Sequence, residues 1–187
     1  GKRVHEVLEW FYNHNKNSNS FYAVDLLLDK FNHLWDSHWH DNIILSRQQY
    51  VIIKKKNRKF RRYLSLDRHK QMFKDIGIKC LVNYYKRDIK GFTKDTIGVE
   101  LKHQVQIDGV NFNCIIDRLD KKKDGVYVIY DYKTGKKPLT HSKAINDLQL
   151  SLYQLAVKEK YNDCNEIILK WYYLRTDEII SIEHNKE

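Results

Sequence analysis

Cysteine, proline and glycine are scarce in this 187-residue chain. One proline and seven glycines leave little material for long flexible linkers. The three cysteines, Cys80, Cys114 and Cys164, are far apart, form no Cys-X-X-Cys pair and are odd in number, so they define no disulfide framework. We therefore expect a reducing, cytoplasmic environment rather than secretion.

Long apolar runs are also missing. The chain contains no run of about 18 apolar residues that would predict a transmembrane helix, and it shows no signal-peptide pattern. It has no strongly basic amphipathic helix with a large apolar face, so we expect no membrane partner. Gly1 stands directly inside a helical pattern, which is typical of a domain excised from a longer protein.

Positive charge, by contrast, is abundant. Hydrophobic residues make up 42% and charged residues 31% of the chain, which predicts a folded globular protein rather than a disordered one. The formal net charge is +10, and a polyanion such as nucleic acid is the partner that this charge favours. A surface that is basic only for solubility is the alternative, and charge alone leaves both interpretations open.

The first half of the chain has the period of helices. Apolar residues spaced three and four apart predict helices over Val4–Tyr12, Phe21–His38 and about Leu66–Ile89. Between the last two, Lys54–Arg62 contains seven basic residues and no acidic one. We expect this stretch to lie within a helical region that extends to about residue 95. It either contacts a phosphate backbone or forms a solvated surface loop.

The second half has the period of strands. Alternating apolar residues flank Asp108-Gly109, the strongest short signal for a hairpin turn. The predicted elements are strands over Val99–Ile107, Val110–Ile116, Gly125–Lys133, Ile167–Leu174 and Glu178–Ile182, and a helix over about Ser142–Lys160. The order after residue 95 is therefore β-β-β-α-β, with a short last strand that pairs with the one before it.

Three charged residues stand out on two neighbouring strands. Asp117 follows an apolar run at the expected end of one strand, and Asp131 and Lys133 lie on the next. Residues two apart on a strand share a face, so Asp131 and Lys133 project together. Folding the two strands back as a hairpin places Asp117 roughly opposite Asp131, which gathers two carboxylates and one ammonium group.

This cluster suits the hydrolysis of a phosphodiester bond. Two carboxylates and a backbone carbonyl, here that of Tyr132, form a hard oxygen site for Mg²⁺, which polarises a phosphoryl oxygen and activates bound water. Lys133 can orient that water or neutralise charge on the phosphate. The alternative is an ordinary edge turn, in which the acid ends a strand and the lysine faces solvent. The strongly apolar strands around Asp131 favour the catalytic interpretation.

The same residues carry a resemblance to a known family. Ile-Ile-Asp-Arg-Leu-Asp at 115–120, followed by Ile-Tyr-Asp-Tyr-Lys-Thr-Gly at 129–135, resembles the RecB-like nucleases of the PD-(D/E)XK superfamily. The pattern of that family is approximately G-x-I-D-R-I-D and then, after a strand, D-Y-K-T. Asn113 or Cys114 stands near the position of the family's glycine, which is a small departure.

Two further motifs extend the resemblance to both sides. Residues 1–9 are similar to the family's G-x-x-x-H-x-x-L-E helix, which implies that His5 is a metal ligand, and an imidazole suits Mn²⁺ and is tolerated by Mg²⁺. Residues 147–156 are similar to its Q-L-x-x-Y helix, which implies that Gln149 and Tyr153 contact DNA or the metal-bound water. Without these neighbours, a surface histidine and a core tyrosine would be the ordinary interpretations.

The resemblance implies a complete set of site residues. The expected catalytic residues are Asp117, Asp131 and Lys133; the expected metal ligands are His5, Asp117, Asp131 and Tyr132; and the expected substrate-binding residues are Gln149, Tyr153 and Arg118. Arg118 would hold either a phosphate or an internal carboxylate, and Asp120 would either support the site residues from behind or have a purely structural role. Glu100 on the first strand is a candidate further acid of the site, but a solvent-facing position is the favoured interpretation, because Glu100 alternates with the apolar residues Val99 and Leu101.

The resemblance also implies the fold and the activity. We expect an α/β fold with a restriction-endonuclease-like core, a central mixed sheet in α-β-β-β-α-β order, and an N-terminal helical insertion. One domain would span 1–187, with a helical part that carries the histidine motif over 1–95 and a catalytic sheet over 96–187. The implied function is that of a Mg²⁺- or Mn²⁺-dependent DNA exonuclease that acts in DNA repair, recombination or end processing. The resemblance also implies a helicase that is fused to this domain or associated with it.

The resemblance leaves two further possibilities, one for the cofactor and one for the function. One branch of the family carries an iron–sulfur cluster on four cysteines, but this chain has three, so we expect no cluster. A non-catalytic nucleic-acid-binding module that retained the fold is the second functional hypothesis. Clustered acids near an anionic ligand argue against such a module, because they would repel it.

Overall fold

Helices precede the main sheet along the chain. The structure, a computed structural model, describes residues 1–16, 23–40, 50–88 and 95–184. Its elements are α1 (Lys2–Asn15), α2 (Val24–His38), β1 (Tyr50–Lys55), β2 (Arg58–Tyr63), α3 (Leu66–Asp88), β3 (Thr96–Ile107), β4 (Val110–Lys121), the 3₁₀ turn η1 (Lys123–Gly125), β5 (Val126–Lys133), α4 (His141–Ile145), α5 (Leu148–Lys160), β6 (Glu166–Tyr173) and β7 (Glu178–His184).

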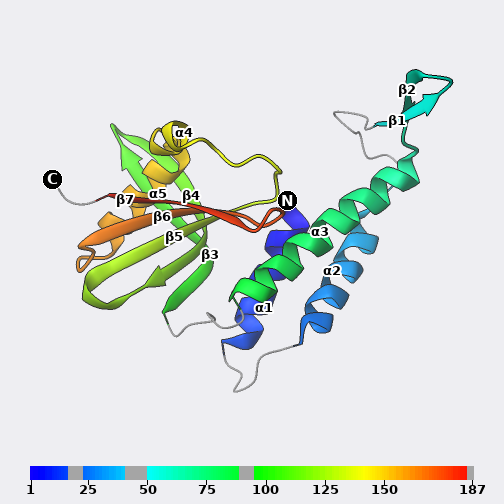
Figure 1. Ribbon diagram of the computed structural model, residues 1–187. Helices are drawn as coiled ribbons and strands as arrows, with labels where there is room; N and C mark the ends of the chain where they lie inside the picture. The colour runs from blue at the N-terminus through cyan, green and yellow to red at the C-terminus, as the bar shows by residue number, and fades with distance from the viewer. Residues whose placement is uncertain (17–22, 41–49, 89–94, 185–187) are drawn as a thin grey trace.

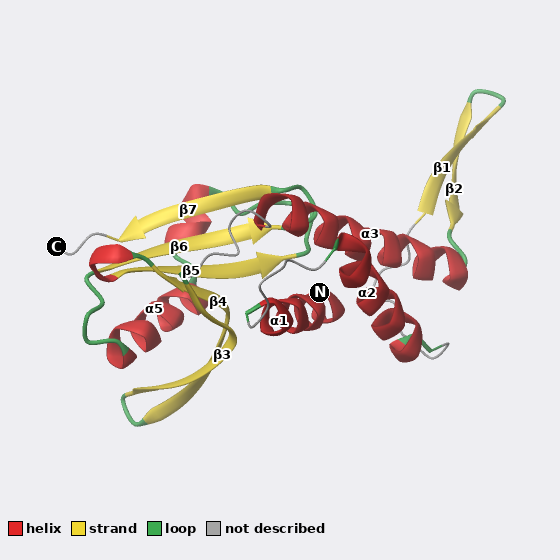
Figure 2. Ribbon diagram, turned by 90° about the horizontal axis from the view of Figure 1, so that it is seen from below, coloured by secondary structure: helices red, strands yellow, loops and turns green. Residues whose placement is uncertain are grey.

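The main sheet is mixed and lies between two helical layers (Figures 1 and 2). Its strand order is β3-β4-β5-β6-β7, in which β5 and β6 are parallel and the other neighbours are antiparallel. The parallel pair requires a crossover, which α4 and α5 provide. One apolar core joins α5 to the sheet, and a second joins α1, α2 and α3 to its other face. The predicted α/β class with a central mixed sheet is confirmed.

The helical layer follows from the apolar spacing of its sequences. Val7 and Leu8 of α1, Leu27 and Phe31 of α2 and several residues of α3 are buried in one cluster. Gly77 lies inside α3 because the ring of Phe31 occupies the position of a side chain there: a Cβ on Gly77 would be 2.2 Å from Cζ of Phe31. The three predicted helices are confirmed, although parts of the ranges predicted for the second and the third lie outside the described residues.

The basic stretch is not helical, which corrects the prediction for Lys54–Arg62. It belongs to the antiparallel hairpin β1–β2, which projects from the N-terminal end of α3 (Figures 1 and 2). The β-branched run 51–53 favours a strand, and Lys56 and Asn57 both adopt positive φ values, 45° and 60°, as a two-residue hairpin turn requires. The helical region before residue 95 therefore contains a two-stranded arm.

Two other boundaries differ from the sequence prediction. The helix expected over Ser142–Lys160 is divided into α4 and α5, because Asp147 caps a new helix by accepting a hydrogen bond from the Leu150 N–H at 3.1 Å. Strand β4 continues to Lys121, so Asp117 lies within the strand rather than at its end. No helix among the described residues has the length and apolar character needed to cross a membrane.

Candidate active site

Strand register brings three acids side by side across β3, β4 and β5. The Asp108-Gly109 turn pairs Ile107 with Val110, and the same register continues to Val99 and Arg118, which places Glu100 across from Asp117. On the other side of β4, Arg118 pairs with Tyr130, so Asp131 follows across from Asp117. Residues opposite one another on neighbouring strands are side-chain neighbours.

The pairing of β4 with its neighbours is irregular on both sides where these acids meet. Glu100 has a φ of 47°, an uncommon value for a residue other than glycine, and hydrogen-bonded pairing of β4 with β5 stops at Arg118. Asp117 replaces the missing backbone partner of Tyr132, because its Oδ2 accepts a hydrogen bond from the Tyr132 N–H at 2.5 Å. Strand irregularities of this kind re-aim side chains, and here they open the sheet next to three carboxylates.

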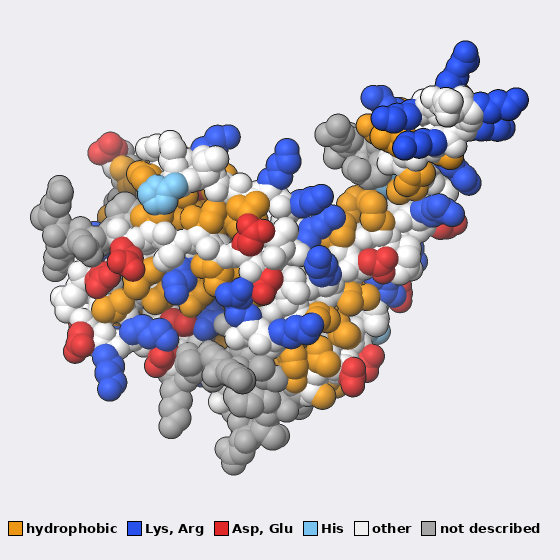
Figure 3. Space-filling view, in the orientation of Figure 1, with side chains coloured by type: hydrophobic (Ala, Val, Ile, Leu, Met, Phe, Trp, Pro, Cys, Tyr) orange, Lys and Arg blue, Asp and Glu red, His pale blue; other side chains and the backbone are white. Residues whose placement is uncertain are grey.

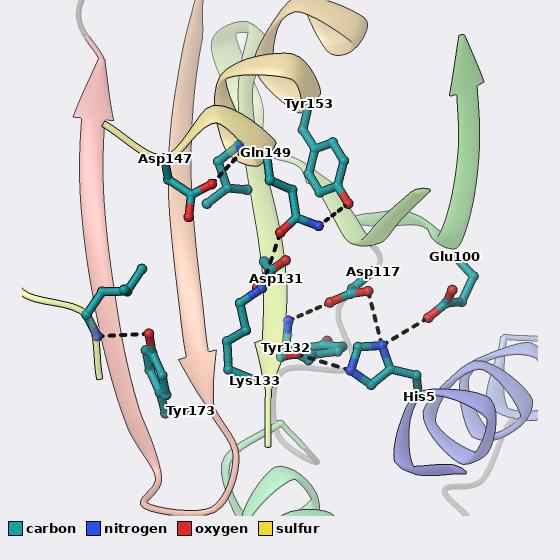
Figure 4. A network of polar contacts seen from close by, with 12 residues as sticks. His5, Glu100, Asp117, Asp131, Tyr132, Lys133, Asp147, Gln149, Tyr153 and Tyr173 are labelled. Atoms are coloured by element: carbon teal, nitrogen blue, oxygen red, sulfur yellow. Dashed lines mark hydrogen bonds and ion pairs between the residues drawn. The ribbon is translucent and has the colours of Figure 1, made fainter. Parts of the chain in front are cut away.

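His5 reaches this opening from α1 (Figure 4). Its Nδ1 lies 3.2 Å from Oδ1 of Asp117 and 3.5 Å from Oε1 of Glu100, and its Nε2 lies 3.1 Å from the carbonyl oxygen of Tyr132. The hydroxyl of Tyr12, two turns further along α1, donates to the Thr96 carbonyl at 2.7 Å and ties the helix to β3. The helix is therefore anchored on the strand that carries Glu100.

The cluster of His5, Glu100 and Asp117 has an excess of negative charge. Within the described parts of the chain, neither carboxylate has a Lys or Arg ion-pair partner. Burial by itself lowers the pKa of His5, but the hydrogen bonds to Asp117 and Glu100 and the negative charges of these two acids together outweigh burial and raise this pKa to about 10. The two carboxylates thus favour a positive charge at the position of the imidazole.

Beside this cluster, Lys133 links the third acid to α5. Its Nζ lies 2.6 Å from Oδ2 of Asp131 and 3.3 Å from Oε1 of Gln149, whose amide donates to the Tyr153 hydroxyl at 2.7 Å (Figure 4). Burial raises the pKa of Asp131 and Lys133 lowers it. Burial also raises the pKa of Tyr153 to about 12, so its hydroxyl stays protonated at neutral pH. The expected residues Asp131, Lys133, Gln149 and Tyr153 therefore form one connected chain of side chains.

Arg118 lies elsewhere, which corrects the prediction that it binds substrate. Its Nε and Nη2 donate to the two carboxylate oxygens of Asp120 at 2.7 and 2.8 Å, and Thr96 also donates to Asp120. Arg118 is 4% exposed and Asp120 is fully buried. Two partners were expected for Arg118, a phosphate or an internal carboxylate, and the structure shows the carboxylate. A phosphate cannot reach a side chain that is enclosed in this way. The structural role expected for Asp120 agrees with this geometry.

The donor atoms fit a hard divalent cation. One ligand atom each from His5, Glu100 and Asp117 lie within 4.8 Å of one another, and carboxylate oxygens with an imidazole suit Mg²⁺ or Mn²⁺. In addition, Oδ2 of Asp131 is buried and accepts no hydrogen bond of good geometry among the described residues, despite its ion pair with Lys133. Asp131 stands outside the three-residue group, and the Tyr132 carbonyl contacts the other ring nitrogen of His5.

Glu100 lies beside His5 and Asp117, although the sequence argument favoured a solvent-facing position for it over a place in the site. The alternation of residues correctly predicted that the Glu100 side chain lies on the face of β3 opposite Val99 and Leu101. Helix α1 covers that face, so Glu100 contacts His5 instead of solvent. The signal was present in the Asp108-Gly109 turn, because a two-residue turn fixes the register that sets Glu100 opposite Asp117.

Comparison with known families agrees with this geometry. The family model of the PD-(D/E)XK nuclease superfamily matches residues 1–184. The chain belongs to the PD-(D/E)XK nuclease superfamily. Residues 131–133 read Asp-Tyr-Lys, a D-X-K sequence, and the residue before Asp117 is Ile116 rather than proline. The five-stranded mixed sheet agrees with the restriction-endonuclease-like fold of this superfamily. A comparison with curated proteins found no match.

Membership supports a nuclease that binds nucleic acid and uses a divalent metal. The match covers the helical front as well as the sheet, so His5 lies inside the matched region together with the three acids.

Proposed function

We propose that this PD-(D/E)XK chain is a Mg²⁺- or Mn²⁺-dependent deoxyribonuclease, acting as a RecB-like exonuclease in DNA repair, recombination or end processing. The observation that carries the proposal is the meeting of Glu100, Asp117 and Asp131 across three adjacent strands, beside His5 and Lys133. The resemblance to RecB-like nucleases extends the proposal to a cytoplasmic setting and to a fused or associated helicase.

The acids and the histidine form the metal-binding part of the site. His5, Glu100, Asp117 and Asp131, with the carbonyl of Tyr132, are the groups that would hold the ion. When bound, the metal polarises the scissile phosphate and lowers the pKa of an attacking water. Without the metal, His5 is the one described residue that forms an ion pair with Glu100 or Asp117, so these two carboxylates favour a cation strongly.

Lys133 supplies the positive charge that the phosphate requires. Asp131 and Gln149 hold its amine from two sides, which limits the directions in which it can donate. From this position the amine orients the attacking water or stabilises charge that builds up on the phosphate. Gln149 is exposed and Tyr153 is buried beneath it, so Gln149 is the member of this pair that can contact DNA directly.

A non-catalytic DNA-binding module is the competing function. It would need the basic surface but gains nothing from three clustered acids, which repel phosphate unless a cation lies between them. The same acids would therefore weaken binding in a module of that kind. Their connection to Lys133 favours catalysis.

The test is cleavage of end-labelled single-stranded and duplex DNA by the full chain, with Mg²⁺ or Mn²⁺ and with excess chelator. We expect cleavage only with metal, and loss of cleavage in Lys133→Ala with DNA binding retained. Lys123→Ala, which removes an exposed lysine from the β4–β5 turn, is the matched control and should cleave normally. Wild-type protein that binds DNA but leaves it intact would support the binding module, and full activity in Lys133→Ala would contradict the role given to that amine.

A further inference from the structure

The β1–β2 hairpin has a composition that its own fold does not explain. Every residue of both strands is exposed, and among the described strands the two pair only with each other. Residues 50–64 carry seven positive charges and no negative one. They also expose large apolar side chains: Ile52 is 62%, Tyr63 53% and Phe60 49% exposed. An isolated two-stranded hairpin is marginally stable in water, so these exposed groups point to a partner.

Both faces of the hairpin combine the same two kinds of side chain. One face carries Tyr50, Ile52 and Tyr63 next to basic residues, and the other carries Ile53 and Phe60 next to basic residues. Toward the tip, Lys54 faces Lys59 across the strands and Lys55 faces Arg58, which sets like charges opposite one another. Such pairs destabilise a hairpin on its own, and a polyanion relieves the repulsion.

A groove connects this hairpin to the candidate active site. A hollow of about 450 Å³ along α3 begins at Leu64, the residue after β2, and reaches Arg175. A second hollow of about 340 Å³ shares Ile76 and Arg175 with it and ends at Thr134, the residue after Lys133. The two hollows, together called the groove, therefore adjoin at Ile76 and Arg175 and lie in succession from the base of the hairpin toward the edge of the site.

The groove has the charge that a phosphate backbone requires. Its lining contains the basic residues Arg68, Lys79, Arg175, Lys2 and Arg3, against one acid, Asp75. In the space-filling view, Lys and Arg side chains follow the concave edge between the hairpin and the sheet (Figure 3). The segment of α3 along the groove spans roughly 17 Å and the hairpin roughly 20 Å, so the path from site to tip is on the order of 35 Å.

From these features we infer that the β1–β2 hairpin and the groove along α3 form a track for single-stranded DNA that leads into the catalytic site. Phosphates contact the lysines and arginines, and unpaired bases stack on the exposed aromatic and aliphatic side chains of the hairpin. Single-stranded DNA is favoured over duplex because a duplex hides its base faces, whereas the hairpin offers apolar surface together with charge. This inference rests on the proposed DNA nuclease function and names the form of its substrate.

The first test measures binding separately from cleavage. Fluorescence anisotropy would follow a labelled single strand of about 30 nucleotides on the full chain carrying Asp117→Asn, over a series of salt concentrations. The hairpin variant replaces Lys54, Lys55 and Lys59 with Gln; the control replaces Lys123, Lys158 and Lys160, exposed lysines at the β4–β5 turn and the end of α5, with Gln. Both variants lose the same charge.

The hairpin variant should lose at least about tenfold in affinity, with a salt dependence flatter by roughly 2 in log–log slope, since each strand phosphate contributes about 0.7. The control should bind within about twofold of the parent. Unfolding of the hairpin does not explain such a loss, because removing the Lys54–Lys59 pair relieves repulsion. If the hairpin variant and the control variant bind the single strand with equal affinity, or lose equal affinity, the proposed DNA track is wrong.

A second pair of measurements tests the single-strand assignment. Phe60→Ala should weaken binding by about tenfold without changing the salt slope, because it removes a stacking surface and no charge. A duplex of the same length should bind more weakly than the single strand. Tighter duplex binding, together with no effect of Phe60→Ala, would overturn the assignment to unpaired DNA.

Cleavage by chains with an intact Asp117 then separates this inference from the proposed function. The hairpin lysine variant should cut strands of about 3 nucleotides, too short to reach the hairpin, as the wild type does, and cut the longer strand more slowly. Binding that depends on the hairpin without any cleavage would support the track and contradict the nuclease function. Wild-type cleavage of both strands by this variant would contradict the track and leave the nuclease function standing.

Discussion

Two acids of strand β4, three residues apart, lie in opposite surroundings. Asp120 is fully buried and is matched by Arg118, with a second hydrogen bond from Thr96. Asp117 is 11% exposed and shares one imidazole with a second carboxylate. An acid whose charge is matched inside the core stabilises the fold, whereas acids in excess at an opening favour a cation from outside. The charge balance around each acid, rather than its position in the motif, separates the structural acid from the functional one.

The largest effect is expected at Asp117. Asp117→Asn should reduce cleavage by at least about 10³-fold, the scale of removing one preorganised electrostatic group, because it removes a charge that holds the metal. Stability should stay close to wild type, since the Asn oxygen still accepts the Tyr132 N–H. Single-turnover cleavage and thermal melting measure the two quantities. Asp108→Asn at the hairpin turn is the control, and a variant at Asp117 with more than a small fraction of wild-type cleavage contradicts the comparison.

The opposite result is expected at Asp120. Asp120→Asn leaves the buried Arg118 without its counter-charge, and breaking a buried ion pair costs about 3–5 kcal/mol in the free energy of unfolding. Urea denaturation measures this loss. Asp163→Asn, in the exposed pair with Lys121, should leave the unfolding midpoint close to wild type. If the Asp120 and Asp163 variants lose equal stability, the buried pair is not structural in the way described.

Metal binding should stabilise the wild type and depend on Glu100. With Mn²⁺ at 100 times its dissociation constant, the gain is about 2.7 kcal/mol, or roughly 5–10 °C in Tm for a chain of this size. Glu100→Gln should lose most of this shift, because Glu100 is one of the three clustered donors. Glu178→Gln, an exposed acid on β7, should keep the full shift. A full Mn²⁺ shift in Glu100→Gln means that Glu100 is not a ligand.

The smallest effect is expected at Gln149, which touches Lys133 from outside the acid cluster. Gln149→Ala should lower kcat by about tenfold with KM nearly unchanged, because Lys133 loses one of two partners that orient it. Gln154→Ala on the same helix is the control. A rise in KM at constant kcat would instead indicate that direct contact with DNA, which the exposure of Gln149 also allows, outweighs its positioning of Lys133.

Local sequence patterns were sufficient for most of the fold. The period of apolar residues predicted α1, α2 and α3, and alternation with a two-residue turn predicted β3 and β4. The hairpin β1–β2 was missed because four of the six residues of its second strand are basic, so no regular alternation of apolar and polar residues marks it. The break between α4 and α5 depends on a side-chain cap at Asp147, which outweighs an otherwise helical spacing.

The site was predictable as far as neighbouring strands define it. Asp117, Asp131 and Lys133 meet because they lie on adjacent strands joined by a short turn, and this follows from sequence order. Glu100 required the register of the preceding hairpin and the knowledge that α1 covers its face. The pairing of Arg118 with Asp120 depends on burial, which the motif does not encode.

The measurement that tests the central claim most directly is a crystal structure of the full chain soaked in Mn²⁺, with anomalous scattering used to locate the metal. The account predicts a peak within coordination distance of the side chains of His5, Glu100 and Asp117, the group whose donor atoms already lie within 4.8 Å of one another. A metal bound only elsewhere, with these three side chains paired to one another as before, would contradict it.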